Sequence, residues 1–117
     1  MSRLPQRWHV YVVDLEPRVG TKPGKQRPAV AIQPDELTEA GLPSTVILPL
    51  TSKVVANAFP LRVSIPAGMC GLKKASDVIV DQILAWDNKL FRDDLGLLPE
   101  VFQDEIRRAL LEFLDLI

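Results

Sequence analysis

The sequence predicts a mainly β (α+β) fold, a small antiparallel β-barrel or sheet against which one C-terminal helix packs. Two observations support this class. Five short segments rich in apolar and β-branched residues alternate with segments containing Pro and Gly, as in strands joined by turns. Only the segment after Pro99 repeats apolar residues every three or four positions, which indicates an amphipathic helix. With 117 residues, we expect a single domain over residues 1–117.

The first half of the chain contains two predicted strands and a short helix. Residues 8–15 (WHVYVVDL) are rich in aromatic and β-branched side chains, which favours a strand. Residues 17–24 (PRVGTKPG) hold two Pro and two Gly and predict a loop. Residues 27–32 (RPAVAI) predict a second strand, with Pro28 at its first positions or on an edge because proline donates no ladder hydrogen bond. Residues 34–40 (PDELTEA) predict a helix that begins with proline and acids.

The second half is expected to contain three more strands and the terminal helix. The strands are predicted at 45–50 (TVILPL), 61–65 (LRVSI) and 76–85 (SDVIVDQILA), with a turn at 66–71. The last strand is the most apolar, so we expect it at the centre of the sheet. The helix is expected to bury one stripe, which consists of Phe102, Ile106, Ala109, Leu110, Phe113, Leu114 and Ile117.

The net charge of −1 by itself argues against a nucleic-acid-binding protein. However, residues 1–30 carry six basic and two acidic side chains, a local charge of +4, whereas residues 85–117 carry −4. Such a basic end can bind phosphate groups. A solvated surface of mixed charge explains the same distribution, and is the simpler explanation of the charges taken alone.

Several classes of protein are excluded by residues that the chain lacks. The longest uncharged stretch has 13 residues, where a membrane helix needs about 20, and charges interrupt any signal-like segment near the start. The single Cys70 cannot form an internal disulfide, so we expect a cytoplasmic protein without a membrane partner. The lone His9 excludes a paired-histidine ribonuclease within one chain. Neither a metal-ligand spacing nor a nucleotide-binding motif occurs, so we expect no metal and no cofactor.

The remaining polar residues gather around the second and third predicted strands. If these strands pair antiparallel, Arg27 at the start of one lies near Thr51 at the end of the other. Pairing Ile32 with Thr45 would place Arg27 opposite Leu50. A shift of one residue decides whether Arg27 and Thr51 share a face, and the sequence leaves this register open.

An Arg beside a Thr-Ser pair suits an oxyanion such as phosphate. The guanidinium offers a planar fork of donors, Thr51 and Ser52 add hydroxyls, and Lys22 and Lys25 add charge on the adjoining loop. For each residue alone, a surface ion pair or a strand-end hydrogen bond is the simpler interpretation.

Asp81, Gln82 and Trp86 interrupt or follow the last predicted strand. Buried polar groups need hydrogen-bond partners, so we expect Asp81 to stabilise the interior of the barrel. Gln82 could instead line a cleft and contact the edge of a base. Trp86 could stack on a base, although a tryptophan at this position is more often part of the core.

At this point the sequence resembles the MazF/PemK family, the endoribonuclease toxins of bacterial toxin–antitoxin pairs. The matching segments occur in family order and are VYVVDLEP (10–17), GTKPGKQRPAVAIQPD (20–35), STVILPLTS (44–52), GLKKAS (71–76) and VDQI (80–83). The resemblance implies an SH3-like barrel with a C-terminal helix and a homodimer. It also implies metal-independent cleavage of single-stranded RNA, and a cognate antitoxin whose extended tail occupies the RNA groove.

The resemblance also implies roles for individual residues. The family's catalytic Arg, in an Arg-Pro pair, matches Arg27, and its catalytic Thr matches Thr51. The reaction implied is attack of a ribose 2′-hydroxyl on the adjacent phosphorus, which gives 2′,3′-cyclic phosphate and 5′-hydroxyl ends. We expect RNA contacts from Lys22, Lys25, Ser52 and Gln82.

Two departures from the family pattern bear on function. Lys22 stands where many members carry an acid, which argues against an acidic base from that loop, and Trp8-His9 replaces the usual Gly-Asp or Gly-Glu. Two alternatives stay open. One is a gyrase-poisoning toxin of the same shape, which would need a Trp-Gly-Ile ending where this sequence has Asp115-Leu116-Ile117. The other is an inactive barrel that binds RNA or another partner.

Overall fold

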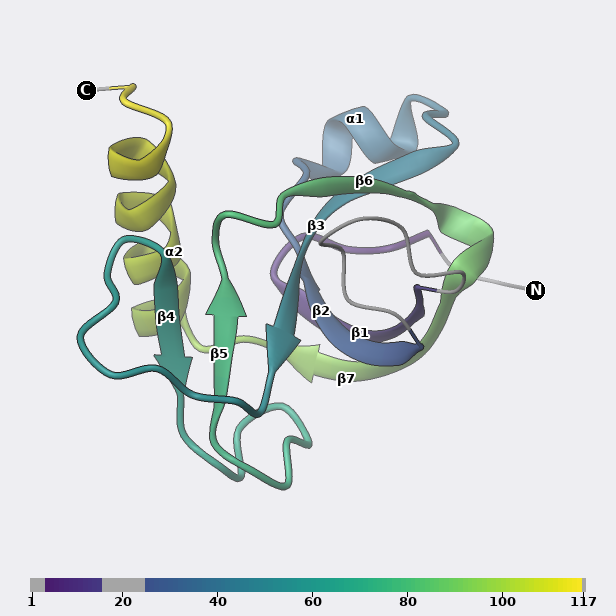
Figure 1. Ribbon diagram of the computed structural model, residues 1–117. Coiled ribbons are helices and arrows are strands. Elements are labelled where there is room, and N and C mark those ends of the chain that lie inside the picture. The colour runs from purple at the N-terminus through teal and green to yellow at the C-terminus, as the bar shows by residue number, and fades with distance from the viewer. Residues whose placement is uncertain (1–3, 16–24, 117) are drawn as a thin grey trace.

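The computed structural model describes residues 4–15 and 25–116, and within them the chain forms one curved antiparallel sheet flanked by helices (Figure 1). The strands are β1 (His9–Asp14), β2 (Gln26–Ala31), β3 (Ser44–Thr51), β4 (Arg62–Ile65), β5 (Ser76–Ile79), β6 (Leu84–Asp87) and β7 (Phe91–Leu97). The helices are α1 (Asp35–Glu39), the 3₁₀ helix η1 (Asn88–Leu90) and α2 (Glu100–Phe113). The mainly β fold class with a C-terminal helix is therefore confirmed.

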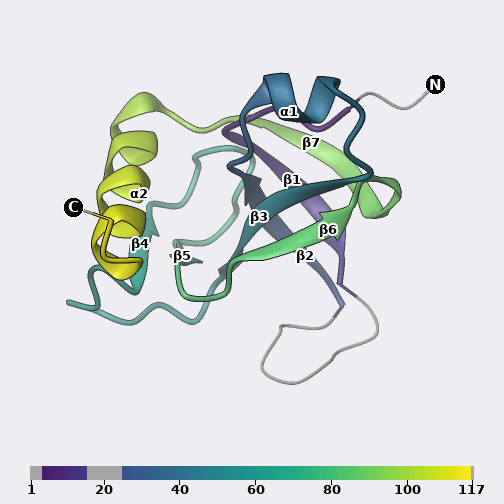
Figure 2. The same cartoon turned by 90° about the horizontal axis from the view of Figure 1, so that it is seen from above.

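The sheet runs in the order β4-β5-β3-β2-β1-β7, and β6 pairs with the first half of β3. Viewed from above, β4, β5 and α2 lie on one side of β3, while β1, β2, β6 and β7 curve around the other (Figure 2). The predicted barrel is not closed, because the described strands include no pairing between β6 and β7. Strand β3 joins both halves, since its last residues pair with β5 and its first with β6.

Most predicted elements are confirmed to within two residues. These are the strands β1 to β4, the short helix α1 and the turn before Leu72. The terminal helix α2 is also confirmed, but it ends at Phe113, whereas the predicted apolar stripe runs to Ile117. The loop predicted at 17–24 lies outside the described residues.

One predicted strand is wrong. The segment 76–85 is not a single central strand but two short ones, β5 and β6, separated by a turn. The amide of Val80 donates to the carbonyl of Leu61, and that of Gln82 to Ile79, so the backbone leaves one half of the sheet here and joins the other. Strand β7 was not predicted, because its charged residues (FRDDLGL) hide the apolar alternation on which the prediction depended.

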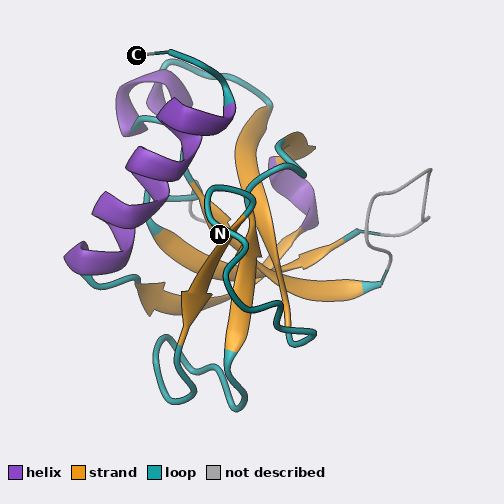
Figure 3. Cartoon of the chain, turned by 60° about the vertical axis from the view of Figure 1, so that its left-hand side comes forward, coloured by secondary structure: helices purple, strands orange, loops and turns teal. Residues whose placement is uncertain are grey.

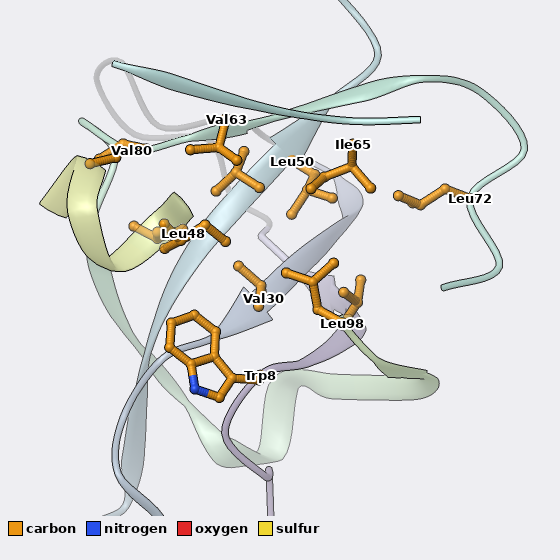
Figure 4. Close-up of a cluster of buried hydrophobic side chains, with 13 residues drawn as sticks. Trp8, Val30, Leu48, Leu50, Val63, Ile65, Leu72, Val80 and Leu98 are labelled. Atoms are coloured by element: carbon orange, nitrogen blue, oxygen red, sulfur yellow. The ribbon is translucent and has the colours of Figure 1, made fainter. Parts of the chain in front are cut away.

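Both faces of the sheet are buried along the second half of β2 and most of β3, which explains why these two strands lack a clean alternation of apolar and polar residues. Side chains alternate along a strand. Val30 and Leu48 therefore contribute to the larger core, which also includes Trp8 and residues of α2 (Figure 4). Ala29 and Ile47 point the other way, into a smaller core enclosed by the curved strands.

Helix α2 lies along the flank of the sheet (Figure 3) and joins it through Ile106 and Ala109, which are fully buried. Phe102 and Leu110 pack against the same core. The predicted stripe is too long, because Phe113 and Leu114 are exposed and lie beyond the residues that contact the core. No helix in the described part of the chain has the length and apolarity needed to cross a membrane.

Truncation of Ile106, through which α2 packs on the sheet, should destabilise the protein. Ile106→Ala is expected to lower the free energy of unfolding by about 2–5 kcal/mol, because it deletes buried methyl groups and leaves a cavity. Val101→Ala on the same helix, where the side chain is 66% exposed, should change it by no more than about 0.5 kcal/mol. Urea unfolding of both variants measures this difference. Equal losses would show that α2 does not contribute to the core through Ile106.

Candidate active site at the ends of strands β2 and β3

The antiparallel pairing of β2 with β3 brings Arg27, near the start of β2, close to Thr51, at the end of β3. The ladder pairs Ala29 with Pro49, and continuing this register by two residues places Arg27 opposite Thr51. Opposed residues in an antiparallel pair project from the same face of the sheet. The register differs by one residue from the pairing that would have set Arg27 opposite Leu50. That difference puts both side chains on one face.

Arg27 and Thr51 line a pocket of about 250 Å³ at this end of the sheet. Four of the six predicted site residues line it, namely Lys25, Arg27, Thr51 and Ser52. The other lining residues are Gln26, Pro28, Leu50 and Ser76. None of these eight is acidic, so the described wall of the pocket combines two cations with several hydroxyl groups. Such a set of donors suits an oxyanion.

Local backbone structure positions the two ends of this pocket. Lys25 immediately precedes β2 in a left-handed conformation (φ 67°), and its carbonyl accepts a hydrogen bond from Leu15 at 2.9 Å. Thr51 is the last residue of β3 and is buried, whereas Ser52 is exposed. The Thr51 Oγ1 accepts a hydrogen bond from the Lys53 amide at 3.2 Å, which leaves the hydroxyl proton as a donor. Arg27 is half-buried.

Gln82 does not join this pocket. It lines a separate one of about 380 Å³, together with Val55, Ala58, Leu61, Arg62, Ile79 and Asp81. Lys22 lies outside the described residues. The expectation that Asp81 stabilises the interior is wrong, since Asp81 is exposed in the turn between β5 and β6. The interior carboxylate is Asp77, which sequence reasoning missed.

Trp86, His9 and Cys70 have structural roles. Trp86 packs against the smaller core, and its indole donates to the carbonyl of Asp14 at 2.6 Å, which confirms the core interpretation. His9 in β1 lies 3.1 Å from Asp94 in β7. Burial raises the pKa of the Cys70 thiol, which contacts the carbonyl of Leu97 and packs against the larger core.

Within residues 4–15 and 25–116, no group of three or more His, Cys, Asp or Glu could hold a metal ion.

The fold and the pocket define a small antiparallel β protein that presents an anion-suited site where two strands end. Residues 6–114 match the family described as "PemK-like, MazF-like toxin of type II toxin-antitoxin system". The chain belongs to this toxin family, as the resemblance of its motifs predicted.

Individual relatives agree with this assignment. The chain is 32% identical over 110 residues to a protein of Mycobacterium bovis named Endoribonuclease MazF2, covering 94% of this chain and 96% of that one. Its fold is similar to a crystal structure of MazF from Deinococcus radiodurans, with a TM-score of 0.79, 24% identity, and coverage of 97% and 99%. It is also similar, with a TM-score of 0.75, 20% identity and 97% coverage of both chains, to a mycobacterial endoribonuclease solved in complex with its cognate antitoxin.

Proposed function

We propose that this chain is an endoribonuclease toxin and that the pocket between β2 and β3 is its catalytic centre. The observation that carries the proposal is the pocket that Arg27 and Thr51 line together with Lys25 and Ser52. Its membership of the MazF-like toxin family and its relative named as an endoribonuclease support this activity. The substrate is single-stranded RNA, whose phosphates suit the cationic pocket.

The proposed reaction begins with attack of a ribose 2′-oxygen on the neighbouring phosphorus. The 2′-hydroxyl loses its proton, the bond from phosphorus to the 5′-oxygen breaks, and the leaving oxygen gains a proton. The products are a 2′,3′-cyclic phosphate and a 5′-hydroxyl. Negative charge accumulates on the phosphorane oxygens, where preorganised donors stabilise it most strongly.

Arg27 and Thr51 have complementary roles in this step. A guanidinium stays protonated in proteins, so Arg27 stabilises the phosphorane charge and is a poor general base. Thr51 donates its hydroxyl proton to a phosphate oxygen. Lys25 and Ser52 hold the flanking backbone, and we assign Lys22 and Gln82 to RNA contacts further along the strand, with Gln82 in its separate pocket.

Two protein partners follow from the family. The toxin is neutralised by a cognate antitoxin, whose extended tail occupies the RNA groove, and the related mycobacterial complex supports this pairing. We further propose that the toxin is a homodimer that acts in the cytoplasm, where its RNA substrate is found.

The activity can be tested with pure protein and a long RNA in the presence of EDTA. We expect discrete fragments that carry 2′,3′-cyclic phosphate and 5′-hydroxyl ends, because the proposed step needs no metal. Sequencing the fragment ends would also give the cleavage sequence. Intact RNA under these conditions would contradict the proposal and favour an inactive RNA-binding barrel. Inhibition of gyrase without any RNA cleavage would favour the gyrase-poisoning alternative.

A further inference from the structure

Asp77 is a buried carboxylate close to the pocket but not part of its lining. It lies in β5 with none of its surface exposed. Its Oδ1 accepts from the hydroxyl of Ser64 at 2.9 Å, and its Oδ2 accepts from the amide of Val55 at 2.9 Å and from Nη1 of Arg62 at 3.1 Å. A buried carboxylate requires such partners to offset the loss of water.

These contacts continue to the pocket. Nη1 of Arg62 also donates to the carbonyl of Lys53 at 3.2 Å, and the amide of Lys53 donates to Oγ1 of Thr51 at 3.2 Å. Thr51 itself faces Asp77 in the ladder between β3 and β5. The contacts therefore run from the buried carboxylate through Arg62 to the backbone of Lys53, whose amide in turn donates to the hydroxyl of Thr51.

The segment held in this way lies outside the regular elements of the described chain. Residues 52–55 follow the end of β3, belong to no strand or helix, and are exposed. Asp77 holds one end of this segment at Val55, and Arg62 holds its middle at Lys53. By contrast, β4 and β5 pair through four residues each, so this hairpin does not depend on the Asp77 side chain alone.

We propose that Asp77, acting through Arg62, is a positioning residue that fixes segment 52–55 and thereby orients the Thr51 hydroxyl toward the pocket. This inference rests on the proposed ribonuclease function. A hydroxyl rotates freely about its bond, and the Lys53 amide determines which direction its proton takes. Without the carboxylate, Arg62 no longer holds the backbone of Lys53 in place. The Thr51 hydroxyl, which donates to the phosphate, then loses its fixed direction.

The test compares single-turnover cleavage of a short RNA substrate by the wild type and Asp77→Asn. We expect a rate about 10- to 100-fold lower at saturating enzyme, since a misplacement of about 1 Å can cost about 100-fold, with RNA affinity changed less than about threefold. In a Thr51→Ala background the same substitution should change the rate less than about twofold, because residues that act through one another are not additive.

A matched control separates positioning from loss of stability. Thr45 is buried at the other end of β3, where its hydroxyl donates to Asn88 at 2.6 Å. Thr45→Val should lower the melting temperature and leave the cleavage rate unchanged. If Asp77→Asn does not fold, Arg62→Gln takes its place, because the Arg62 side chain is partly exposed, at 23%.

The possible outcomes distinguish this inference from the function on which it rests. A wild type that does not cut RNA overturns both. If the wild type cuts and Thr51→Ala is impaired, two results overturn only the positioning role. One is an unchanged rate in Asp77→Asn. The other is an equal loss from Asp77→Asn in the presence and absence of the Thr51 hydroxyl.

Discussion

Arg27→Ala is expected to lower the single-turnover rate of RNA cleavage by about 10²–10³-fold, the typical effect of removing one preorganised donor from a transition-state charge. Arg27 lies near the start of β2 and is half-buried beside the pocket. Arg27 pairs with Val13 in the β1–β2 ladder through its backbone, which the substitution keeps, so we expect the fold to stay intact. Circular dichroism and the oligomeric state should match those of the wild type.

A control from the same sheet makes this result specific. The Arg92 side chain in β7 is 41% exposed, its Nη2 lies 3.6 Å from Oδ2 of Asp14, and Arg92 is not among the residues that line the pocket. Arg92→Ala should cut RNA at the wild-type rate. Arg27→Lys should recover only part of the activity, because an ammonium keeps the charge but lacks the planar fork. Normal cleavage by Arg27→Ala would remove Arg27 from the mechanism.

The second large effect concerns the substrate. An RNA oligonucleotide with one 2′-deoxyribose at the cleaved position should give no product, because the attacking oxygen is missing. The same oligonucleotide with the deoxyribose one nucleotide further along should still be cut. Gel analysis of both after long incubation with excess protein measures this difference. Cleavage at the deoxy position would show that water, rather than the 2′-oxygen, attacks the phosphorus.

The meeting of Arg27 with Thr51 was predictable, whereas their shared face was not. Two strands joined by a short helical connection pair antiparallel, which brings the start of one to the end of the other. Register is read from alternation, and here alternation is hidden because both faces of β2 and β3 are buried. The ladder pairs Ala29 with Pro49, and only this register, continued by two residues, sets Arg27 opposite Thr51 and not Leu50.

The two errors in the strand prediction have different physical causes. Residues 76–85 are rich in β-branched and other apolar residues and hold no Gly or Pro, so the sequence predicts one strand, whereas the turn at Val80 depends on a hydrogen bond to the distant Leu61. Strand β7 is an edge strand with consecutive charged residues, and its place is set by pairing with β1. In both cases tertiary contacts override the local pattern.

Asp77 and Asp81 also show that local sequence does not determine which residues are buried. Asp77 and Asp81 both interrupt one apolar run, and the sequence gives no sign of which is buried. The structure buries Asp77 because Arg62 and Ser64 on the neighbouring strand β4 can donate to it. Asp77 can be recognised as the buried acid only once the pairing of β4 with β5 is known, because this pairing brings Arg62 and Ser64 beside it.

The location of the catalytic centre can be tested by a crystal structure of the protein with an RNA that carries the single 2′-deoxyribose described above. We predict that the phosphate beside the modified sugar sits in the pocket between β2 and β3. There the guanidinium of Arg27 and the hydroxyl of Thr51 should each lie about 3 Å from one of its oxygens. A phosphate bound in the pocket that contains Gln82, with Arg27 touching no part of the RNA, would contradict this assignment.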